Sequence, residues 1–311
     1  MISPGTLLLR FYHTPLGRIR NSLRNGGPWA ERNTERQRKE MESAAGRLPG
    51  LPEFPGTEPV TLHLMTGRKF WYQTLFCLHS FARTAQTSVR AELYDDGSID
   101  DTCADRLLRL GPGARIHPYS ELRSALDLHF PADRFPTLRE RWLNYPNLRK
   151  LMDVHAESSG WKLVIDSDLL FFRRPGLLLD WLATPSHPLH AVDCVESYGY
   201  SRELMKKLAG APIPALVNVG LCGLRSDGLD WAEIERWCSE LIAREKTSYF
   251  LEQALVAMLV ARRQPCVVAP AADYVTMPSR AETLAPTAVM HHYVAGSKRW
   301  YFRNGWRLAA G

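Results

Sequence analysis

The sequence lacks closely spaced cysteine pairs and long apolar runs. None of the six cysteines stands in a Cys-x-x-Cys pair, and all six are widely scattered. This spacing argues against a zinc or dithiol redox site, so we expect reduced and mostly buried thiols. No apolar run reaches the roughly 18 residues that span a bilayer, and residues 1–10 are too short and too poorly organised for a secretory leader. We therefore expect no membrane-spanning segment and, by default, a cytoplasmic location.

The composition is that of a globular protein with a sizeable core. The 311 residues are 45% apolar and 23% charged, which suits one large domain or two fused halves. The net charge is +6, from 39 Lys and Arg against 33 Asp and Glu. This modest excess favours acidic partners such as phosphates or anionic lipid, and we expect no nucleic-acid partner.

Residues 1–56 have the character of an arm, because they lack a core-forming pattern. We expect one helix over residues 29–45, a linker rich in proline and glycine over residues 48–56, and a single large domain over residues 57–311. The arm is rich in basic residues, namely Arg10, Arg18, Arg20, Arg24, Arg32, Arg36, Arg38, Lys39 and Arg47. It could form a solvated flap or make a peripheral contact with anionic lipid at a membrane.

The stretch Trp161–Phe172 organises the rest of the chain. A short apolar run, Leu163–Ile165, predicts a buried parallel strand and is followed by Asp166 and Asp168. Side chains alternate along a strand, so we expect Asp166 and Asp168 to share one face of the strand end while Ser167 points away. Two adjacent carboxylates are tolerated when a divalent cation binds them, and oxygen ligands suit Mg²⁺ or Mn²⁺. Two solvated acids in a strand-to-loop turn are the simpler alternative.

Strand and helix patterns alternate before this stretch. Residues 60–65, 89–94 and 114–117 predict strands, residues 70–83 predict an amphipathic helix, and residues 136–157 predict a long helical region that Pro146 interrupts. This order predicts an α/β fold with a Rossmann-like, mostly parallel sheet flanked by helices. Ligands of such sheets bind beyond the carboxyl ends of the strands, where Asp166 and Asp168 would lie.

Two motifs resemble those of the glycosyltransferases that use nucleotide-diphosphate sugars and have the GT-A fold. The run Asp95-Asp96-Gly97-Ser98-x-Asp100-Asp101-Thr102 is similar to a loop of family 2 and its relatives. The run Val164-Ile165-Asp166-Ser167-Asp168 resembles the metal-binding Asp-x-Asp motif shared across the fold. The resemblance implies that Asp95 or Asp96 contacts the base or the ribose of a nucleotide.

The second half of the chain resembles glycosyltransferase family 8. Asn218-Val219-Gly220 is similar to an Asn-x-Gly strand of that family, and Glu252-Gln253 falls where the family has an Asp-Gln pair. The segment from His292 through Lys298 to Trp300 resembles the terminal His, Gly, Lys-Pro-Trp segment, although Gly296 is one place late and Arg299 replaces the proline. The resemblance covers roughly residues 60–306.

The resemblance implies a role for each of these residues. The metal, Mn²⁺ or Mg²⁺, would be bound by Asp166, Asp168 and His292. The nucleotide diphosphate, from a donor expected to be a UDP-sugar, would be contacted by Asp95, Asp96, Arg149, Lys150 and Lys298. The sugar and the acceptor would be contacted by Gln253, Glu252 and Asn218. Similarity to family 8 further implies sugar transfer to an acceptor hydroxyl, on a carbohydrate, lipid or protein, with retention of configuration.

Three alternatives remain at this point. An inverting, family 2-like mechanism would use a carboxylate as a base. A binding protein for carbohydrate or lipid could keep the same scaffold without catalysis. A phosphatase of the haloacid-dehalogenase type also begins with Asp-x-Asp, but it needs Thr or Val where this chain has Leu170, and the motif here lies in mid-chain.

Overall fold

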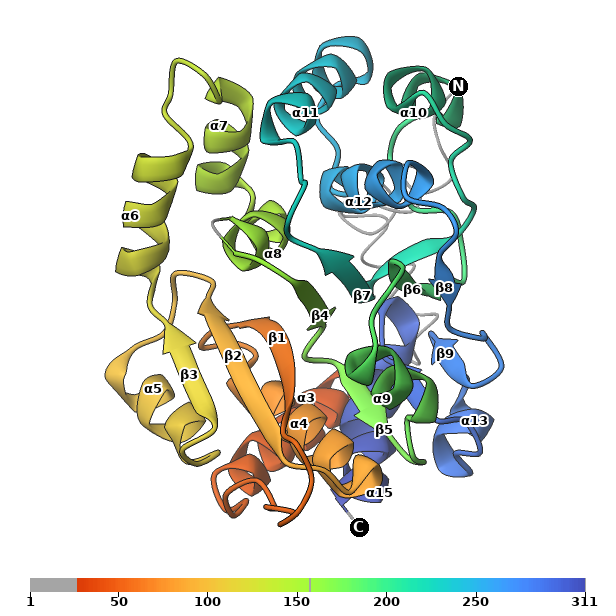
Figure 1. Cartoon of the computed structure of the whole chain (residues 1–311). Helices are drawn as coiled ribbons and strands as arrows, with labels where there is room; N and C mark the ends of the chain where they lie inside the picture. Colours follow the sequence, from red (N-terminus) through yellow and green to blue (C-terminus); the bar gives the residue numbers. More distant parts are fainter. Residues whose placement is uncertain (1–26, 157, 311) are drawn as a thin grey trace.

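The computed structural model describes residues 27–156 and 158–310, which fold around a seven-stranded sheet (Figure 1). The order of the strands across this sheet is β3-β2-β1-β4-β7-β6-β8. The strands are β1 (Val60–Thr66), β2 (Val89–Asp95), β3 (Ala114–His117), β4 (Trp161–Ile165), β6 (Leu189–Val192), β7 (Val217–Arg225) and β8 (Val267–Val268). Helices cover the sheet, so the predicted α/β class is confirmed.

The first half of the sheet follows the sequence pattern closely. Strands β1, β2 and β3 pair in parallel, and helices α4 (Trp71–Ala85) and α5 (Asp101–Leu108) connect them. Alternate side chains such as Leu62 and Leu64 are fully buried in one hydrophobic core with α4. The three predicted strands and the first predicted helix are therefore confirmed to within two residues.

Strand β4 marks the point where the sheet stops being parallel. On one side β4 pairs in parallel with β1, through His63 and Val164. On the other side it pairs with β7 in the antiparallel direction, and β7 is also antiparallel to β6. The predicted parallel half-sheet is thus present, and an antiparallel strand is inserted beside its acidic end.

A second, three-stranded sheet joins distant parts of the chain. It contains β5 (Leu169–Phe171), β9 (Tyr274–Thr276) and β10 (Met290–His292), in the order β5-β10-β9. Strand β10 pairs antiparallel with β5, so His292 lies opposite Leu169. The backbone amide of Tyr293 also donates to the carbonyl of Asp168 at 3.1 Å. This pairing brings the C-terminal His292 next to the end of β4.

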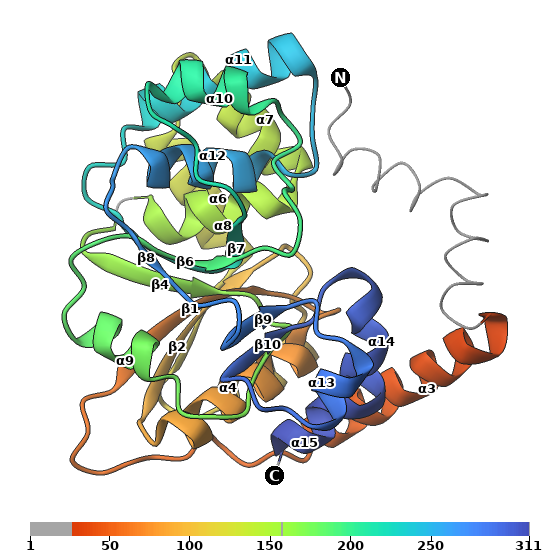
Figure 2. The same cartoon turned by 90° about the vertical axis from the view of Figure 1, so that its right-hand side faces the viewer.

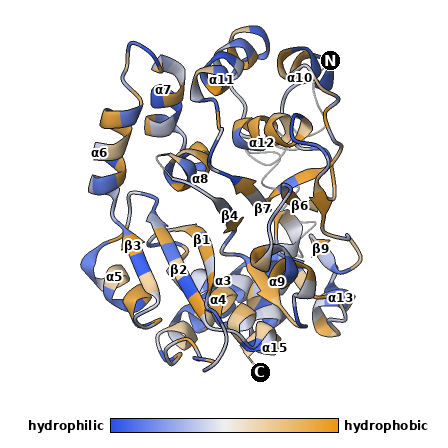
Figure 3. Ribbon diagram, viewed as in Figure 1, coloured by the Kyte–Doolittle hydropathy of each residue, from blue (hydrophilic) through white to orange (hydrophobic). Residues whose placement is uncertain are grey.

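A group of helices from the middle of the chain forms a second core on the other face of the large sheet (Figures 1 and 2). They include α6 (Tyr119–His129), α7 (Pro136–Asn144), α8 (Pro146–His155), α10 (Arg202–Ala209), α11 (Trp231–Glu245) and α12 (Leu251–Ala261). The break at Pro146 is confirmed, whereas α6 is not among the predicted elements. Every residue of α12 is buried, and in Figure 3 this helix is mostly hydrophobic. Its polar first turn holds Glu252 and Gln253.

The C-terminal segment returns to the first core. Its helices are α13 (Arg280–Leu284), η1 (Ala295–Ser297), α14 (Lys298–Trp300), η2 (Tyr301–Gly305) and α15 (Trp306–Ala310). A helix from mid-chain, α9 (Gly176–Ala183), lies near β5. Tyr301 is fully buried, and the Trp306 ring packs against Phe76 of α4 at 5.1 Å between ring centroids.

The helix predicted for residues 29–45 is present as α3 (Gly27–Ala45). It packs against the first core through Met41 and Ala45, which are almost completely buried. Figure 2 shows α3 running beside the C-terminal helices. The basic residues predicted for the arm before Gly27 lie outside the described residues.

The cysteines and the helices bear on two expectations from the sequence, namely reduced and mostly buried thiols and the lack of a membrane-spanning segment. All six cysteines are free, and four of them, Cys77, Cys103, Cys222 and Cys238, are buried. No helix among the described residues combines the length and the apolar character needed to cross a bilayer.

Candidate metal and nucleotide site

The Asp-x-Asp motif lies in a turn, and the prediction that it continues the strand is wrong. Strand β4 ends at Ile165, and Asp166 to Asp168 form a turn before β5. The backbone of Asp166 is fixed from two sides, because its amide donates to the Gly220 carbonyl at 2.8 Å and its carbonyl accepts from the Cys77 thiol at 3.6 Å. The turn, rather than strand alternation, directs both carboxylates to one place.

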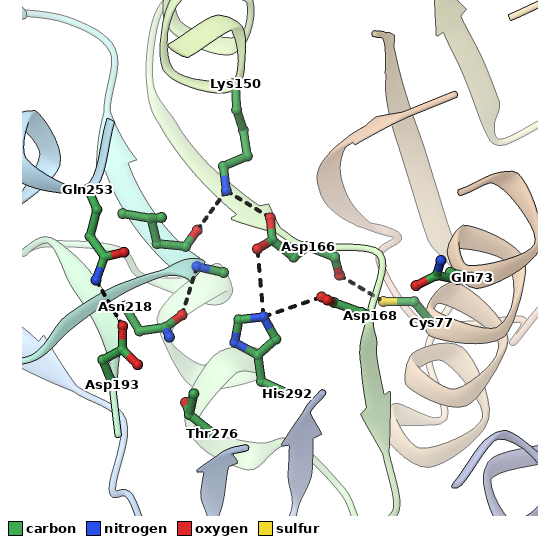
Figure 4. A network of polar contacts seen from close by, with 12 residues as sticks. Gln73, Cys77, Lys150, Asp166, Asp168, Asp193, Asn218, Gln253, Thr276 and His292 are labelled. Atoms are coloured by element: carbon green, nitrogen blue, oxygen red, sulfur yellow. Dashed lines mark hydrogen bonds and ion pairs between the residues drawn. The ribbon is translucent and has the colours of Figure 1, made fainter. Parts of the chain in front are cut away.

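His292 completes a group of three metal-ligand side chains (Figure 4). Its Nε2 lies 3.2 Å from Asp168 Oδ1 and 3.7 Å from Asp166 Oδ2. One ligand atom from each residue lies within 4.8 Å of the others. His291 points elsewhere, since its Nδ1 lies 3.1 Å from the Tyr293 hydroxyl. The structure therefore places His292, and not His291, beside the two acids.

The electrostatics of this group are dominated by burial and by mutual attraction. Burial alone would raise the pKa of Asp168, but the positive charges of Lys298 and His292 hold that pKa well below its usual range. Burial alone would lower the pKa of His292, but Asp168 and Asp166 raise it. The site thus favours a carboxylate at Asp168 and positive charge close to it.

Polar atoms in the group lack hydrogen-bond partners among the described residues. Asp168 Oδ1 and Nε2 of His292 are inaccessible to solvent and face each other at 3.2 Å as an ion pair, but neither they nor Nδ1 of His292 makes a hydrogen bond with a described residue. Buried polar groups are nearly always hydrogen-bonded, so atoms that converge on one point with only an ion pair between them leave room for a further partner. Two carboxylates and an imidazole are ligands that Mn²⁺ and Mg²⁺ accept, and the residues therefore fit such an ion.

Two lysines frame the two acids from opposite sides. Lys150 on α8 donates from Nζ to Asp166 Oδ1 at 2.7 Å and to the Val219 carbonyl at 3.2 Å. Lys298 donates to Asp168 Oδ2 at 2.6 Å and to Gln73 Oε1 at 3.2 Å. Each acid therefore has its own cation. Lys150 is buried, whereas about a third of the Lys298 side chain is exposed.

Glu252 is joined to the acids through Lys150. Its Oε1 lies 3.5 Å from Lys150 Nζ, at the start of the buried helix α12. Burial raises the pKa of Glu252 to about 7, against the lowering effect of Lys150. Burial would lower the pKa of Lys150, but Asp166 and Glu252 raise it. A protonated Lys150 therefore connects α8, the Asp-x-Asp turn and α12.

Gln253 and Asn218 lie on the other side of the same site (Figure 4). Gln253 Nε2 donates to Asp193 Oδ2 at 2.9 Å and to the Val217 carbonyl at 2.8 Å. Asn218 Oδ1 accepts from the Gly220 amide at 2.8 Å. Asp193 follows β6 and carries no motif in the sequence, so its place beside Gln253 could be found only from the fold.

Gly220 is the residue that allows His292 to approach the acids. A Cβ atom at this position would lie 2.2 Å from Cε1 of His292, far inside van der Waals contact. The family resemblance singled out an Asn-x-Gly strand but did not explain why the strand needs a glycine. The structure gives the reason, which is the close approach of the His292 ring. Any side chain at position 220 would displace the imidazole ring.

The loop after β2 is built differently from the Asp-x-Asp turn. Asp95 Oδ1 accepts from the backbone amides of Gly97, Ser98 and Ile99 at 2.8–3.1 Å. Its Oδ2 accepts from the amide of Tyr119 at 3.2 Å. Asp95 therefore fixes the loop and is itself buried.

Asp96 and Arg149 belong to the same loop. Asp96 Oδ1 accepts from the Ser98 amide at 3.0 Å, and a Cβ atom at Gly67 would lie only 2.1 Å from this oxygen. Arg149 donates to the Asp96 carbonyl at 2.7 Å, and its guanidinium lies 4.5 Å from the Trp142 ring centroid. Arg149 thus holds the loop, while Lys150, the next residue, reaches the acids.

Several proteins of known structure are similar to this chain in fold. No protein-family model and no curated protein matches the sequence. Among solved structures, the galactosyltransferase LgtC in complex with donor and acceptor sugar analogues superposes with a TM-score of 0.51 at 14% identity, over 80% of this chain and 95% of that one. Mouse xyloside xylosyltransferase 1 gives a TM-score of 0.50 at 12% identity, over 77% and 99%.

The bifunctional glycosyltransferase WbbM is a third similar structure. It gives a TM-score of 0.50 at 15% identity over 83% of this chain, which spans 52% of WbbM. All three are glycosyltransferases that share the fold of this chain over 77–83% of its length. The chain therefore has the GT-A fold that its two acidic motifs predict.

Proposed function

We propose that the protein is a metal-dependent glycosyltransferase that moves a sugar from a nucleotide-diphosphate sugar to an acceptor hydroxyl. The observation that supports this most directly is the convergence of Asp166, Asp168 and His292 on a GT-A fold. The catalytic domain would comprise residues 57–311. LgtC was solved with donor and acceptor sugar analogues, which supports a nucleotide-sugar donor and a carbohydrate acceptor here.

Asp166, Asp168 and His292 would hold Mn²⁺ or Mg²⁺. When bound, such an ion supplies Lewis-acid stabilisation of the diphosphate leaving group. Lys298 is the part-exposed cation of the site, so it can exchange Asp168 for a diphosphate oxygen when donor binds. Lys150 is buried between Asp166 and Glu252, so its first role would be to hold the Asp166 carboxylate in place.

The nucleoside would lie over the loop that follows β2. Asp96 is the better candidate for a contact with base or ribose, because Asp95 already accepts four backbone amides. Arg149 would support this contact by fixing the Asp96 backbone. We assign uridine diphosphate as the nucleotide from the resemblance to family 8.

The sugar and the acceptor would lie toward α12 and β7. Gln253 and Asn218 line this side, and Glu252 would act through Lys150 because both groups are buried. Retention follows from the family 8 resemblance, with the leaving phosphate taking the acceptor proton. The loop that suggested an inverting mechanism uses Asp95 to accept backbone amides, which leaves that carboxylate no role as a base.

A thermal-shift screen of nucleotide sugars with and without Mn²⁺ tests the binding half of this proposal. Ligands that bind only the native state raise the unfolding midpoint. We expect a rise for UDP-sugars that requires Mn²⁺, and the same samples are then assayed for transfer and for release of free sugar. Binding without any turnover would indicate a non-catalytic carbohydrate-binding protein, and no binding with any nucleotide would refute the proposal.

A further inference from the structure

A cavity that is separate from the metal site lies between α3 and the C-terminal segment. Its volume is about 520 Å³. Figure 2 shows α3 beside the helices that end the chain. The lining residues include Asn33, Arg36, Gln37, Arg280, Trp300 and Arg303.

The cavity is rich in arginine and poor in acid. Three arginines line it, and no carboxylate is among the described lining residues. The nearest recorded carboxylate partner is Glu40, which lies 3.8 Å from Arg36 but is already engaged by Arg307 at 2.6 Å. Within residues 27–156 and 158–310, neither Arg280 nor Arg303 forms an ion pair with a carboxylate. The charges of Arg280 and Arg303 are therefore not balanced by an ion pair within the part of the chain that the structure describes.

The guanidinium groups gather around a single indole ring. The guanidinium carbons of Arg280 and Arg303 each lie 5.7 Å from the Trp300 ring centroid, and that of Arg299 lies 4.4 Å away. Arg303 is fixed in place because its Nε donates to the Thr34 hydroxyl at 3.0 Å. Burial and the charges of Arg299 and Arg280 lower the pKa of Arg303. Arg280 and Arg303 repel one another, and an anion between them would offset that repulsion.

We propose that this cavity binds a phosphate monoester or diphosphate group. Arginine matches phosphate oxygens in a bidentate manner, and asparagine and glutamine side chains can donate to the remaining oxygens. Trp300 offers a flat apolar face beside the charge, which suits the ring of a phosphorylated sugar. The group could belong to a soluble phosphorylated sugar or to a phospholipid head group, which present the same chemistry.

The position of the cavity links it to the metal site without being part of it. Trp300 and Lys298 belong to the same short helix, α14, and Lys298 reaches Asp168. A phosphate group bound against Trp300 would therefore contact the helix that carries Lys298. The binding proposal itself does not depend on the proposed transferase activity.

The test measures phosphate binding to the full chain in EDTA, so that the proposed metal-dependent site does not contribute. The soluble probes are pyrophosphate and glucose 6-phosphate, measured by titration calorimetry. The membrane probe is a vesicle of phosphatidylcholine with phosphatidic acid, compared with phosphatidylcholine alone. Binding of the soluble probes assigns the cavity to a soluble phosphorylated sugar, and binding of the anionic vesicle alone assigns it to a head group.

The decisive comparison is between two charge-matched double variants. Arg36→Gln with Arg280→Gln removes charge from the cavity, whereas Arg90→Gln with Arg115→Gln removes the same charge from exposed positions on β2 and β3. We expect the dissociation constant to rise at least tenfold in the first variant and less than twofold in the second. The single variant Arg36→Gln, at a side chain that is 72% exposed, gives a smaller loss without risk to folding.

Two results would overturn the proposal. One is the absence of binding of every probe to the unmodified protein, and the other is an equal loss in both double variants, which would indicate only non-specific attraction. Mn²⁺-dependent binding of UDP is measured on the same variants and should be unchanged. Failure of the cavity and failure of the proposed transferase function are thereby distinguished.

Discussion

The chain has two acidic turns at the same edge of one sheet, and they differ in what their carboxylates contact. After β2, Asp95 accepts four backbone amides, so its charge is used to fix a loop. After β4, Asp166 and Asp168 are contacted by two lysines and by His292, while Asp168 Oδ1 and the His292 nitrogens make no hydrogen bond within residues 27–156 and 158–310. The first turn is complete without a ligand, and the second is not. Hydrogen-bond partners therefore separate a structural acid from a ligand-binding acid.

The largest effect should follow from a change in the second turn. We expect Asp168→Asn to reduce turnover by about 100-fold or more, because a neutral amide is a poor ligand for a hard cation and leaves Lys298 without its ion-pair partner. No gain in stability is expected, since Lys298 and His292 already compensate the Asp168 charge. Mn²⁺-dependent UDP binding and sugar release are measured, with Asp105→Asn on the exposed face of α5 as a control. Full UDP affinity in the variant would refute the metal assignment.

A change in the first turn should instead affect stability. Removing the carboxylate in Asp95→Ala leaves four backbone amides without their acceptor, and we expect a loss of about 2–3 kcal/mol in the free energy of unfolding. Urea denaturation measures this loss, and Asp105→Ala should change stability by less than about 0.5 kcal/mol. If Asp95→Ala kept its stability but lost nucleotide affinity, the two turns would have similar roles and the distinction would fail.

Much of this arrangement could be predicted from the sequence, because it depends on local patterns. Strands β1 to β3 follow from short apolar runs, and the acids after β4 stand out as an abrupt change of polarity. The direction of β7 could not be predicted, because strand pairing depends on contacts between distant segments. The same limit applies to the turn at Asp166, which was expected to be a strand.

Some site residues could be identified from the family resemblance, and others could be identified only from the fold. His292 was named as a ligand only by resemblance, and the pairing of β10 with β5 explains how it comes to lie beside the acids. Lys150 contacts Asp166, Glu252 and Val219, and its expected role at the nucleotide stays a prediction. The carboxylate beside Gln253 has no sequence motif, because Asp193 reaches it through the fold alone. Side-chain partners are set by packing, which no local pattern encodes.

A smaller effect should follow from filling the space behind His292. We expect Gly220→Ala to weaken Mn²⁺ binding by about tenfold, because the new Cβ would displace the imidazole ring while both carboxylates remain. The control is Gly176→Ala at the start of α9, where a Cβ atom would meet nothing within 4 Å. Titration calorimetry with Mn²⁺ and UDP measures both variants. Equal affinities would mean that His292 does not bind the ion.

The smallest effect concerns a third acid, Asp153 on α8, which has neither a backbone donor nor a lysine partner among residues 27–156 and 158–310. Its Oδ1 accepts from Trp142 Nε1 at 2.6 Å, and its Oδ2 has no partner among the described residues. Burial raises the pKa of Asp153 to about 7, against the lowering effects of Trp142 and Arg149. The folded state therefore prefers the protonated carboxyl. Its contribution to stability is fully present below the unfolded pKa of 3.8 and is lost as the pH rises through about 7.

Asp153→Asn should remove this pH dependence while keeping an acceptor for Trp142. A shift of one pKa unit corresponds to about 1.4 kcal/mol, but the side chain is only partly enclosed, so we expect the variant to gain roughly 1 kcal/mol over the unmodified protein between pH 5 and pH 8. Urea unfolding at the two pH values measures the difference between the proteins, which cancels the titration of all other groups. A difference that stays constant with pH would show that Asp153 is ionised throughout. Asp153 would then resemble Asp95 as a charge that the surrounding protein already satisfies.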